Sequence, residues 1–238
     1  MNPSFLLGGE LEVRRVGFGA MRIVEDPDEG RSVLRRALEL GVNFVDTADV
    51  YGAGRSEELV AEALHPYPPG LVIATKGGLG RGFQERHRDA RPERLREACD
   101  ESLRRLRLER IDLYQLHRHD PEVPIEESVG ALEQLRQEGK VRLIGLSNVS
   151  VGQLRAAQSV TSIASVQNEY NRGLLTSEDV LAACEADGIA FLPWRPLGEG
   201  LQSPAEEIRW LLDRSPVILP IPGTSKVEHL EANMATVP

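Results

Sequence analysis

Three short apolar runs of the chain each end on a side chain that can ionise. The runs and the residues that follow them are 42–45 with Asp46, 71–75 with Lys76, and 111–116 with His117. Tyr51 adds a phenol five positions after Asp46. Lys76 stands out because only three of the 28 basic residues are lysine. Arginine has a higher pKa and a bulkier head, so a lysine at a strand end indicates that an amine is needed there.

These four groups together are able to move a proton. A free phenol has a pKa of about 10, and a neighbouring ammonium group lowers that value because it stabilises the phenolate. A carboxylate beside the amine keeps it charged and in place. Tyr51 could then protonate a developing alkoxide near neutral pH, activated by Lys76 and Asp46. The imidazole of His117 could donate a hydrogen bond to the same oxygen and orient it. Each residue alone has an ordinary structural interpretation, but four compatible groups at neighbouring strand ends favour a site.

Strand and helix patterns alternate along the chain after a hairpin around Gly8-Gly9. We expect strands near 15–19, 42–46, 71–75, 111–116, 142–146, 163–167, 189–194 and 217–221. We expect helices near 28–40, 56–64, 92–107, 126–139, 151–158, 177–187 and 204–214, and a last one from about Lys226. Eight β-then-α units predict an α/β fold, a closed parallel (β/α)8 barrel with an N-terminal β-hairpin, in one domain over 1–238. An open doubly wound sheet is the alternative, but no Gly-x-Gly-x-x-Gly follows an early strand.

In such a barrel the carboxyl ends of all the strands open on one face. Asp46, Tyr51, Lys76 and His117 are therefore expected to meet in one pocket.

Composition excludes several classes of function. The net charge of −9 provides no basic field for nucleic acid. No apolar run approaches the roughly 20 residues that span a membrane, and the N-terminus lacks the basic start and long apolar core of a signal peptide. Cys99 and Cys184 lie far apart in helical patterns and are expected to be reduced structural thiols of a cytoplasmic protein.

Several motifs resemble those of the aldo-keto reductases, in that family's order and over nearly the whole chain. They are Val45-Asp46-Thr47-Ala48-Asp49-Val50-Tyr51-Gly52, Ser56-Glu57-Glu58, Ala74-Thr75-Lys76, Asp112-Leu113-Tyr114-Gln115-Leu116-His117, Gly145-Leu146-Ser147-Asn148, Val166-Gln167-Asn168, Pro196-Leu197-Gly198 and Ile221-Pro222-Gly223. Bacterial NADP-dependent members of unassigned substrate are the nearest in pattern.

The resemblance implies reduction of an aldehyde or ketone by hydride transfer from NADPH, with NADH as the alternative cofactor. It makes Tyr51 the proton donor, Lys76 its activator, Asp46 the partner of Lys76, and His117 the group that orients the carbonyl. Ser147, Asn148 and Gln167 would hold the carboxamide, and Trp194 would stack on the nicotinamide ring where the family commonly has tyrosine. Further cofactor contacts are expected from Met21, Arg195, Pro196, Leu197, Gly198, Gly223, Thr224, Lys226, His229 and Asn233.

The adenosine end departs from the family pattern. Members with a strong NADPH preference often have Ile-Pro-Lys-Ser and then an arginine, whereas this chain has Ile221-Pro222-Gly223-Thr224-Ser225-Lys226 and then His229. Lys226 and the helix that it opens could still hold a 2′-phosphate. The segments 22–27 and 195–203 are also shorter than expected, and the second normally helps to cover the pyrophosphate. If that stretch is truly absent from the protein rather than omitted from the sequence, the shortening predicts weak cofactor binding and fast release.

Two other functions compete with this prediction. A metal-dependent barrel hydrolase would use the His-x-His of His117 and His119, but the strand ends at Ser147, Gln167 and Trp194 supply no further ligand. A nicotinamide-binding subunit that senses redox state for a partner would bind cofactor with little turnover. The expected partners are a small carbonyl substrate and no nucleic acid, membrane or metal, in a monomer or weak homo-oligomer.

Overall fold

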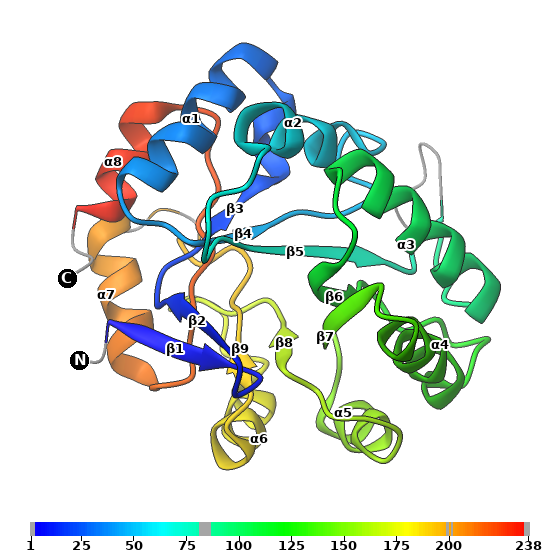
Figure 1. Cartoon of the computed structure of the whole chain (residues 1–238). Coiled ribbons are helices and arrows are strands. Elements are labelled where there is room, and N and C mark those ends of the chain that lie inside the picture. The colour runs from blue at the N-terminus through cyan, green and yellow to red at the C-terminus, as the bar shows by residue number, and fades with distance from the viewer. Residues whose placement is uncertain (1–2, 81–86, 199, 201, 236–238) are drawn as a thin grey trace.

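A computed structural model of the chain describes residues 3–80, 87–198, 200 and 202–235 (Figure 1). The strands are β1 (Ser4–Leu7), β2 (Leu11–Arg14), β3 (Phe18–Gly19), β4 (Phe44–Asp46), β5 (Val72–Gly77), β6 (Ile111–Leu116), β7 (Val141–Ser147), β8 (Ser165–Gln167) and β9 (Ala190–Phe191). The helices are η1 (Ala20–Val24), α1 (Pro27–Glu39), α2 (Arg55–Leu64), α3 (Pro92–Leu106), α4 (Ile125–Gln137), α5 (Val151–Gln158), α6 (Glu178–Asp187), α7 (Pro204–Arg214) and α8 (Val227–Met234).

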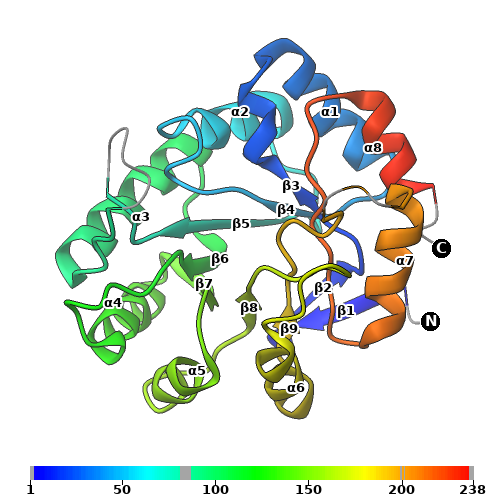
Figure 2. The same cartoon turned by 180° about the vertical axis from the view of Figure 1, so that it is seen from behind.

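Strands β3 to β9 pair in sequence order as one parallel sheet that curls into a barrel, with the helices outside it (Figures 1 and 2). Because each strand returns to the sheet through a helix, consecutive strands are parallel and their carboxyl ends lie at one mouth. The predicted (β/α)8 barrel with an N-terminal hairpin is confirmed.

The eighth strand predicted over 217–221 is present only as extended chain. One parallel bridge joins Phe191 to Ile218, and the segment then passes to the first strand of the barrel, where Gly17 N–H donates to Pro220 O at 2.9 Å. Pro220 and Pro222 lack a backbone N–H, so a regular ladder cannot form there. The predicted strands at 15–19 and 189–194 are also shorter than expected, as β3 and β9. The barrel closes nevertheless, with hydrogen bonds in place of continuous strands.

Helix starts follow local sequence signals. A proline opens α1, α3 and α7, where its missing N–H costs no hydrogen bond. Ser150 and Ser203 form capping boxes with Gln153 and Glu206 at the starts of α5 and α7. These local signals fix where each of the four helices begins.

The hairpin β1–β2 closes the amino-terminal end of the barrel. Gly8 and Gly9 adopt positive φ angles of 59° and 73° in the turn, a conformation that glycine allows without strain. Leu7 and Val13 are fully buried in one cluster with Leu113 of the barrel interior. The hairpin therefore plugs this end, and the opposite end, with the strand carboxyl termini, is left for chemistry.

Arg15 joins the start of the barrel to its end. Its buried guanidinium donates to three backbone carbonyls, those of Leu212, Ser215 and Ile218, at 3.3, 2.9 and 2.9 Å. Burial lowers the pKa of Arg15, and the three carbonyls accept from its Nε and Nη2. A single side chain thus holds the irregular closing segment in place.

Candidate active site

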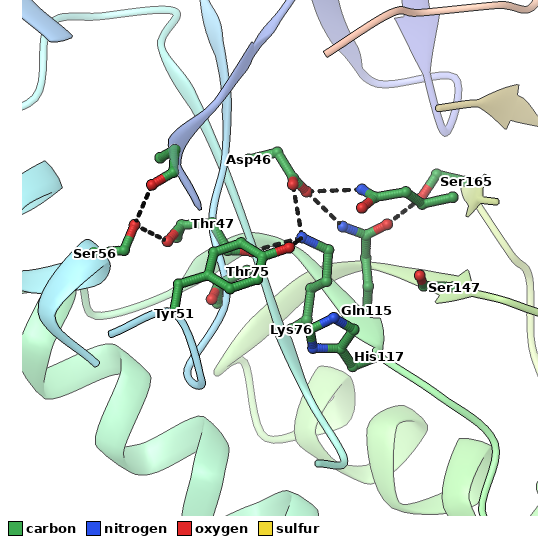
Figure 3. A network of polar contacts seen from close by, with 12 residues as sticks. Asp46, Thr47, Tyr51, Ser56, Thr75, Lys76, Gln115, His117, Ser147 and Ser165 are labelled. Atoms are coloured by element: carbon green, nitrogen blue, oxygen red, sulfur yellow. Dashed lines mark hydrogen bonds and ion pairs between the residues drawn. The ribbon is translucent and has the colours of Figure 1, made fainter. Parts of the chain in front are cut away.

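The ends of β4, β5 and β6 bring the four predicted residues together (Figure 3). The register places Asp46 opposite Ala74 and Lys76 opposite Gln115. Lys76 lies two residues beyond Ala74 on the same face of β5, and its Nζ reaches Asp46 Oδ2. Asp46 ends β4, Lys76 lies near the end of β5, and His117 directly follows β6. Tyr51 lies on the loop between β4 and α2 and points toward Lys76.

The Lys76 ammonium group is the centre of the site. Its Nζ lies 2.6 Å from Asp46 Oδ2, 2.8 Å from Thr47 O and 3.4 Å from Tyr51 Oη, and its side chain is 0% exposed. Burial alone lowers the pKa of Lys76, but Asp46 and Tyr51 raise it, and the net direction is upward. The amine is therefore a buried, charged donor whose three N–H groups have protein acceptors.

Asp46 is held by more donors than sequence reasoning identified. Its Oδ1 accepts from Gln115 Nε2 at 3.0 Å and from Gln167 Nε2 at 2.9 Å, while Oδ2 accepts from Lys76. Both oxygens of the carboxylate are thus engaged away from solvent. Gln115 was missed, although its place on β6, two residues before His117, was a usable signal because side chains two apart share a strand face.

The phenol of Tyr51 has a net pKa shift opposite to the one predicted from sequence. Burial raises the pKa of Tyr51 above 10, and the nearby Lys76 ammonium offsets only part of that rise. The phenolate loses more by leaving water than it gains from one cation, which the sequence argument did not weigh. Tyr51 is accordingly protonated at neutral pH, the state that a proton donor requires.

The imidazole of His117 lies edge-on to the Tyr51 ring, with centroids 5.9 Å apart. Burial, and after it the cations of Lys76 and Arg118, hold the pKa of His117 well below 6.5. The neutral ring donates one N–H and accepts at its other nitrogen. Its Nδ1 is buried and has no hydrogen-bond partner within the described residues.

Two hydrogen-bonded supports fix the loop and strand around Tyr51. Thr47 Oγ1 shares a 2.8 Å hydrogen bond with Ser56 Oγ, which donates to Ala20 O at 2.8 Å. On β5, Thr75 Oγ1 donates to the buried Glu57 at 2.6 Å, and Arg105 pairs with the same carboxylate at 2.6 Å. The Ser56-Glu57 pair noted in the sequence therefore anchors the site from α2.

The residues predicted to hold the carboxamide lie at the next strand ends. Asn148, at φ +57°, donates through Nδ2 to Ser147 Oγ at 2.8 Å and to His117 O at 3.2 Å. Trp194 Nε1 donates to Asn148 Oδ1 at 3.1 Å. Gln167, in contrast, directs its amide N–H to Asp46, so in this structure it belongs to the network around Lys76.

Met21 and the residues predicted to contact the cofactor in the turn 195–198 form a more open surface. Arg195 and Gly198 adopt positive φ angles in a turn, where Arg195 pairs with Glu169 at 3.1 Å and Leu197 packs against an apolar cluster. Residues 199 and 201 of this short segment lie outside the described residues. Met21 is exposed on η1. Pro196 lies inside the turn.

The segment before α8 packs on the start of the barrel. A Cβ on Gly223 would lie 2.6 Å from Gly19 O, so the two backbones touch. Thr224 Oγ1 accepts from Lys226 N–H at 3.0 Å at the helix start. Lys226 and His229 are exposed, whereas Asn233 is buried further along α8.

Two carboxylates that sequence reasoning missed meet the start of α8. Glu29 Oε1 accepts from Val227 N–H at 3.3 Å, and Glu25 accepts from Ser225 Oγ at 3.0 Å. The α8 N-terminus, which carries partial positive charge, thus already contacts an anion of the protein.

Over the described ranges, no cluster of three or more His, Cys, Asp or Glu side chains has an arrangement that could hold a metal ion. Among those same residues, no helix has the length and apolar character needed to cross a membrane.

Comparison with known proteins agrees with the geometry. The sequence model of the aldo/keto reductase family matches residues 15–208. Pyridoxine 4-dehydrogenase of Escherichia coli is 40% identical over 98% of this chain and 92% of its own length. The structure of a glycerol dehydrogenase from Gluconobacter oxydans superposes with a TM-score of 0.92 at 29% identity, covering 99% of this chain and 90% of that one. The structure of an aldo/keto reductase from Klebsiella pneumoniae, solved with NADP and acetate, superposes with a TM-score of 0.83 at 26% identity. The match covers 100% of this chain and 90% of that one.

The buried Asp46–Lys76 pair beside Tyr51, the parallel barrel and these matches lead to one conclusion: the chain belongs to the aldo/keto reductase family of nicotinamide-dependent oxidoreductases.

Proposed function

We propose that the protein reduces an aldehyde or ketone to an alcohol by hydride transfer from NADPH, with Tyr51 as the general acid. The observation that carries the proposal is the Lys76 ammonium, fully buried between Asp46 Oδ2 at 2.6 Å and Tyr51 Oη at 3.4 Å. A buried cation beside a phenol stabilises the phenolate that remains after a proton leaves.

The residues present at the mouth fit a nicotinamide cofactor. Trp194 offers a half-buried aromatic face, and Ser147 and Asn148 offer polar groups beside it. When bound, the nicotinamide supplies the hydride. NADH is the alternative donor. Because the segment 195–203 is short, we expect weak binding, and a sub-micromolar dissociation constant for NADPH would contradict that expectation.

Protein groups supply the proton and its control. Tyr51 Oη would donate its proton to the carbonyl oxygen as negative charge develops on that oxygen. Lys76 stabilises the resulting phenolate, while Asp46 keeps Lys76 charged. His117, neutral in this environment, donates a hydrogen bond that orients the carbonyl. The phenolate regains its proton from water before the next cycle.

Variation at Tyr51 tests this assignment. Tyr51→Phe removes the proton donor but keeps the ring, and we expect carbonyl reduction to fall by about 10²–10⁴-fold with cofactor binding kept. Tyr67→Phe is the matched control, since its hydroxyl donates to Leu106 O away from the strand ends. The change in NADPH absorbance measures the rate. The compounds to test are aldehydes, ketones and quinones, together with pyridoxal and pyridoxine, and glycerol and its oxidation product. Cofactor binding with no turnover by the unmutated protein would indicate a redox-sensing subunit instead.

We further infer one domain over 1–238, acting as a monomer or weak homo-oligomer in the cytoplasm. Cys99 and Cys184 are buried free thiols, which fits a reducing compartment. Size-exclusion chromatography with light scattering gives the molar mass in solution, and a stable tetramer would contradict the proposed oligomeric state.

A further inference from the structure

Asp49 is a buried carboxyl group that the proposed proton transfer does not use. It lies on the loop between β4 and α2, two residues before Tyr51, and is only 8% exposed. Its Oδ1 is buried and has no hydrogen-bond partner among the residues that the structure describes. An unpaired carboxylate is costly to bury, whereas the protonated acid is much less so.

Asp49 is also tied directly to the site. Its backbone N–H donates to Lys76 O at 3.2 Å, while Lys76 Nζ donates to Thr47 O at 2.8 Å. The loop therefore binds both the backbone and the side-chain amine of Lys76. Tyr51 follows in a turn closed by its own N–H to Ala48 O at 3.2 Å. The Asp49 backbone is therefore fixed to that of Lys76, and a charge on its carboxyl acts on Tyr51.

The elements around Asp49 bring charges of both signs. Glu57 faces it from α2, and Arg94 and Arg105 face it from α3. Burial first, and then the negative charge of Glu57, raise the pKa of Asp49 to about 7, although the two arginines and the Val50 N–H act the other way. Arg105 is paired with Glu57 at 2.6 Å, so the opposite effects of these two charges on Asp49 partly cancel and burial remains the main cause.

The phenols nearby respond to the same charge. An ionised Asp49 raises the pKa of Tyr51, in the same direction as Asp46 and against Lys76. It likewise raises the pKa of Tyr114 on β6. A neutral Asp49 leaves Tyr51 the stronger acid.

We propose that Asp49 is a positioning residue for the reaction, whose neutral carboxyl keeps Tyr51 acidic and whose ionisation sets the upper pH limit of efficient proton donation. The inference rests on the proposed role of Tyr51. It assigns a function to a buried acid that touches neither the substrate site nor Lys76 Nζ, and it predicts a specific pH dependence.

The pH profile of single-turnover reduction tests the proposal. In the unmutated protein we expect the rate to fall by about 3- to 10-fold as pH rises through 7, because an ionised Asp49 raises the pKa of Tyr51 and makes it a weaker proton donor. Asp49→Asn keeps the shape of the side chain but cannot ionise, so the fall in rate near pH 7 should disappear. Asp112→Asn is the matched control, because Asp112 is another partly buried acid with a raised pKa, near the amino-terminal end of the barrel. An unchanged step in Asp49→Asn would overturn the proposal.

A stability profile gives a second readout. The folded protein holds the Asp49 proton more tightly than the unfolded chain, whose pKa is near 3.8, so stability is lost as pH rises from about 4 to 7. Asp49→Asn should therefore raise the melting temperature relative to the unmutated protein more at pH 8 than at pH 5. An equal difference at both pH values would count against the proposal.

If Asp49→Asn fails to fold, the titration of the Asp49 carboxyl carbon, followed by ¹³C NMR in the unmutated protein, still tests the proposal. A titration midpoint near 7 for Asp49 supports the inference, and one near 4 overturns it. This measurement needs no turnover, so it is independent of failure of the proposed carbonyl reduction.

Discussion

The two sides of the barrel mouth are built differently. Around Lys76, the side chains of β4, β5 and β6 are buried, and each polar atom of the Asp46–Lys76 pair has partners within the protein. Around Lys226, the side chains are largely exposed, and the α8 N-terminus contacts Glu29 through a single backbone hydrogen bond.

The difference suits the two tasks that we propose for these sides, proton transfer around Lys76 and cofactor binding around Lys226. Proton transfer needs groups held within a narrow range of distances, which a saturated buried network provides. Cofactor entry and release need a surface that can exchange its partners, and exposed charges screened by salt provide that at small energetic cost. Substitutions should therefore have large effects on the first side and small ones on the second.

The two lysines give the largest expected contrast. Lys76→Met leaves Asp46 buried without its cation, which should lower the free energy of unfolding by about 3–5 kcal/mol. Lys226→Met removes an exposed charge that has no ion pair within the described residues, so stability should change by no more than about 0.5 kcal/mol. Urea denaturation measures both. Equal effects would mean that the two sides do not differ as described.

Trp194 lies between the two sides and should give an intermediate effect. Trp194→Phe keeps a flat face but removes the N–H that holds Asn148 Oδ1 at 3.1 Å. Losing one such hydrogen bond costs about 0.5–1.5 kcal/mol, so the dissociation constant for NADPH should rise by about 2- to 12-fold. Trp210→Phe on α7 is the control, because its ring stacks on Tyr170. Calorimetric titration gives the constants, and equal affinities in both variants would rule out the role of the indole N–H.

Glu29 should give the smallest effect, and one of opposite sign. Glu29→Gln removes a carboxylate from the α8 N-terminus, where an anion is stabilised by about 0.3–1 kcal/mol. We expect binding of 2′,5′-ADP to tighten by about 2- to 5-fold, with ADP unchanged and the gain smaller at high salt. Glu231→Gln, which loses only its pair with Arg36, is the control. Equal tightening for ADP would show that Glu29 does not compete with a 2′-phosphate.

The location of the strand-end residues at one mouth could be predicted from the sequence, because it follows from where each strand ends and from the barrel topology. Asp46, Lys76 and His117 each terminate an apolar run, and parallel strands bring such ends to one mouth. Gln115 was harder to identify, since a polar residue inside a strand can face the barrel interior or a helix, and only the register opposite Lys76 shows which.

The sequence by itself determined the barrel, the hairpin and the four side chains that we propose handle the proton, because periodicity and strand ends are local properties of the chain. Only the tertiary structure decided the direction of the Tyr51 pKa, the partners of Gln167 and the meeting of Glu29 with α8. Each of these depends on burial or on contacts between segments far apart in sequence. Desolvation and long-range hydrogen bonds exist only once the chain has folded, so no local pattern records them.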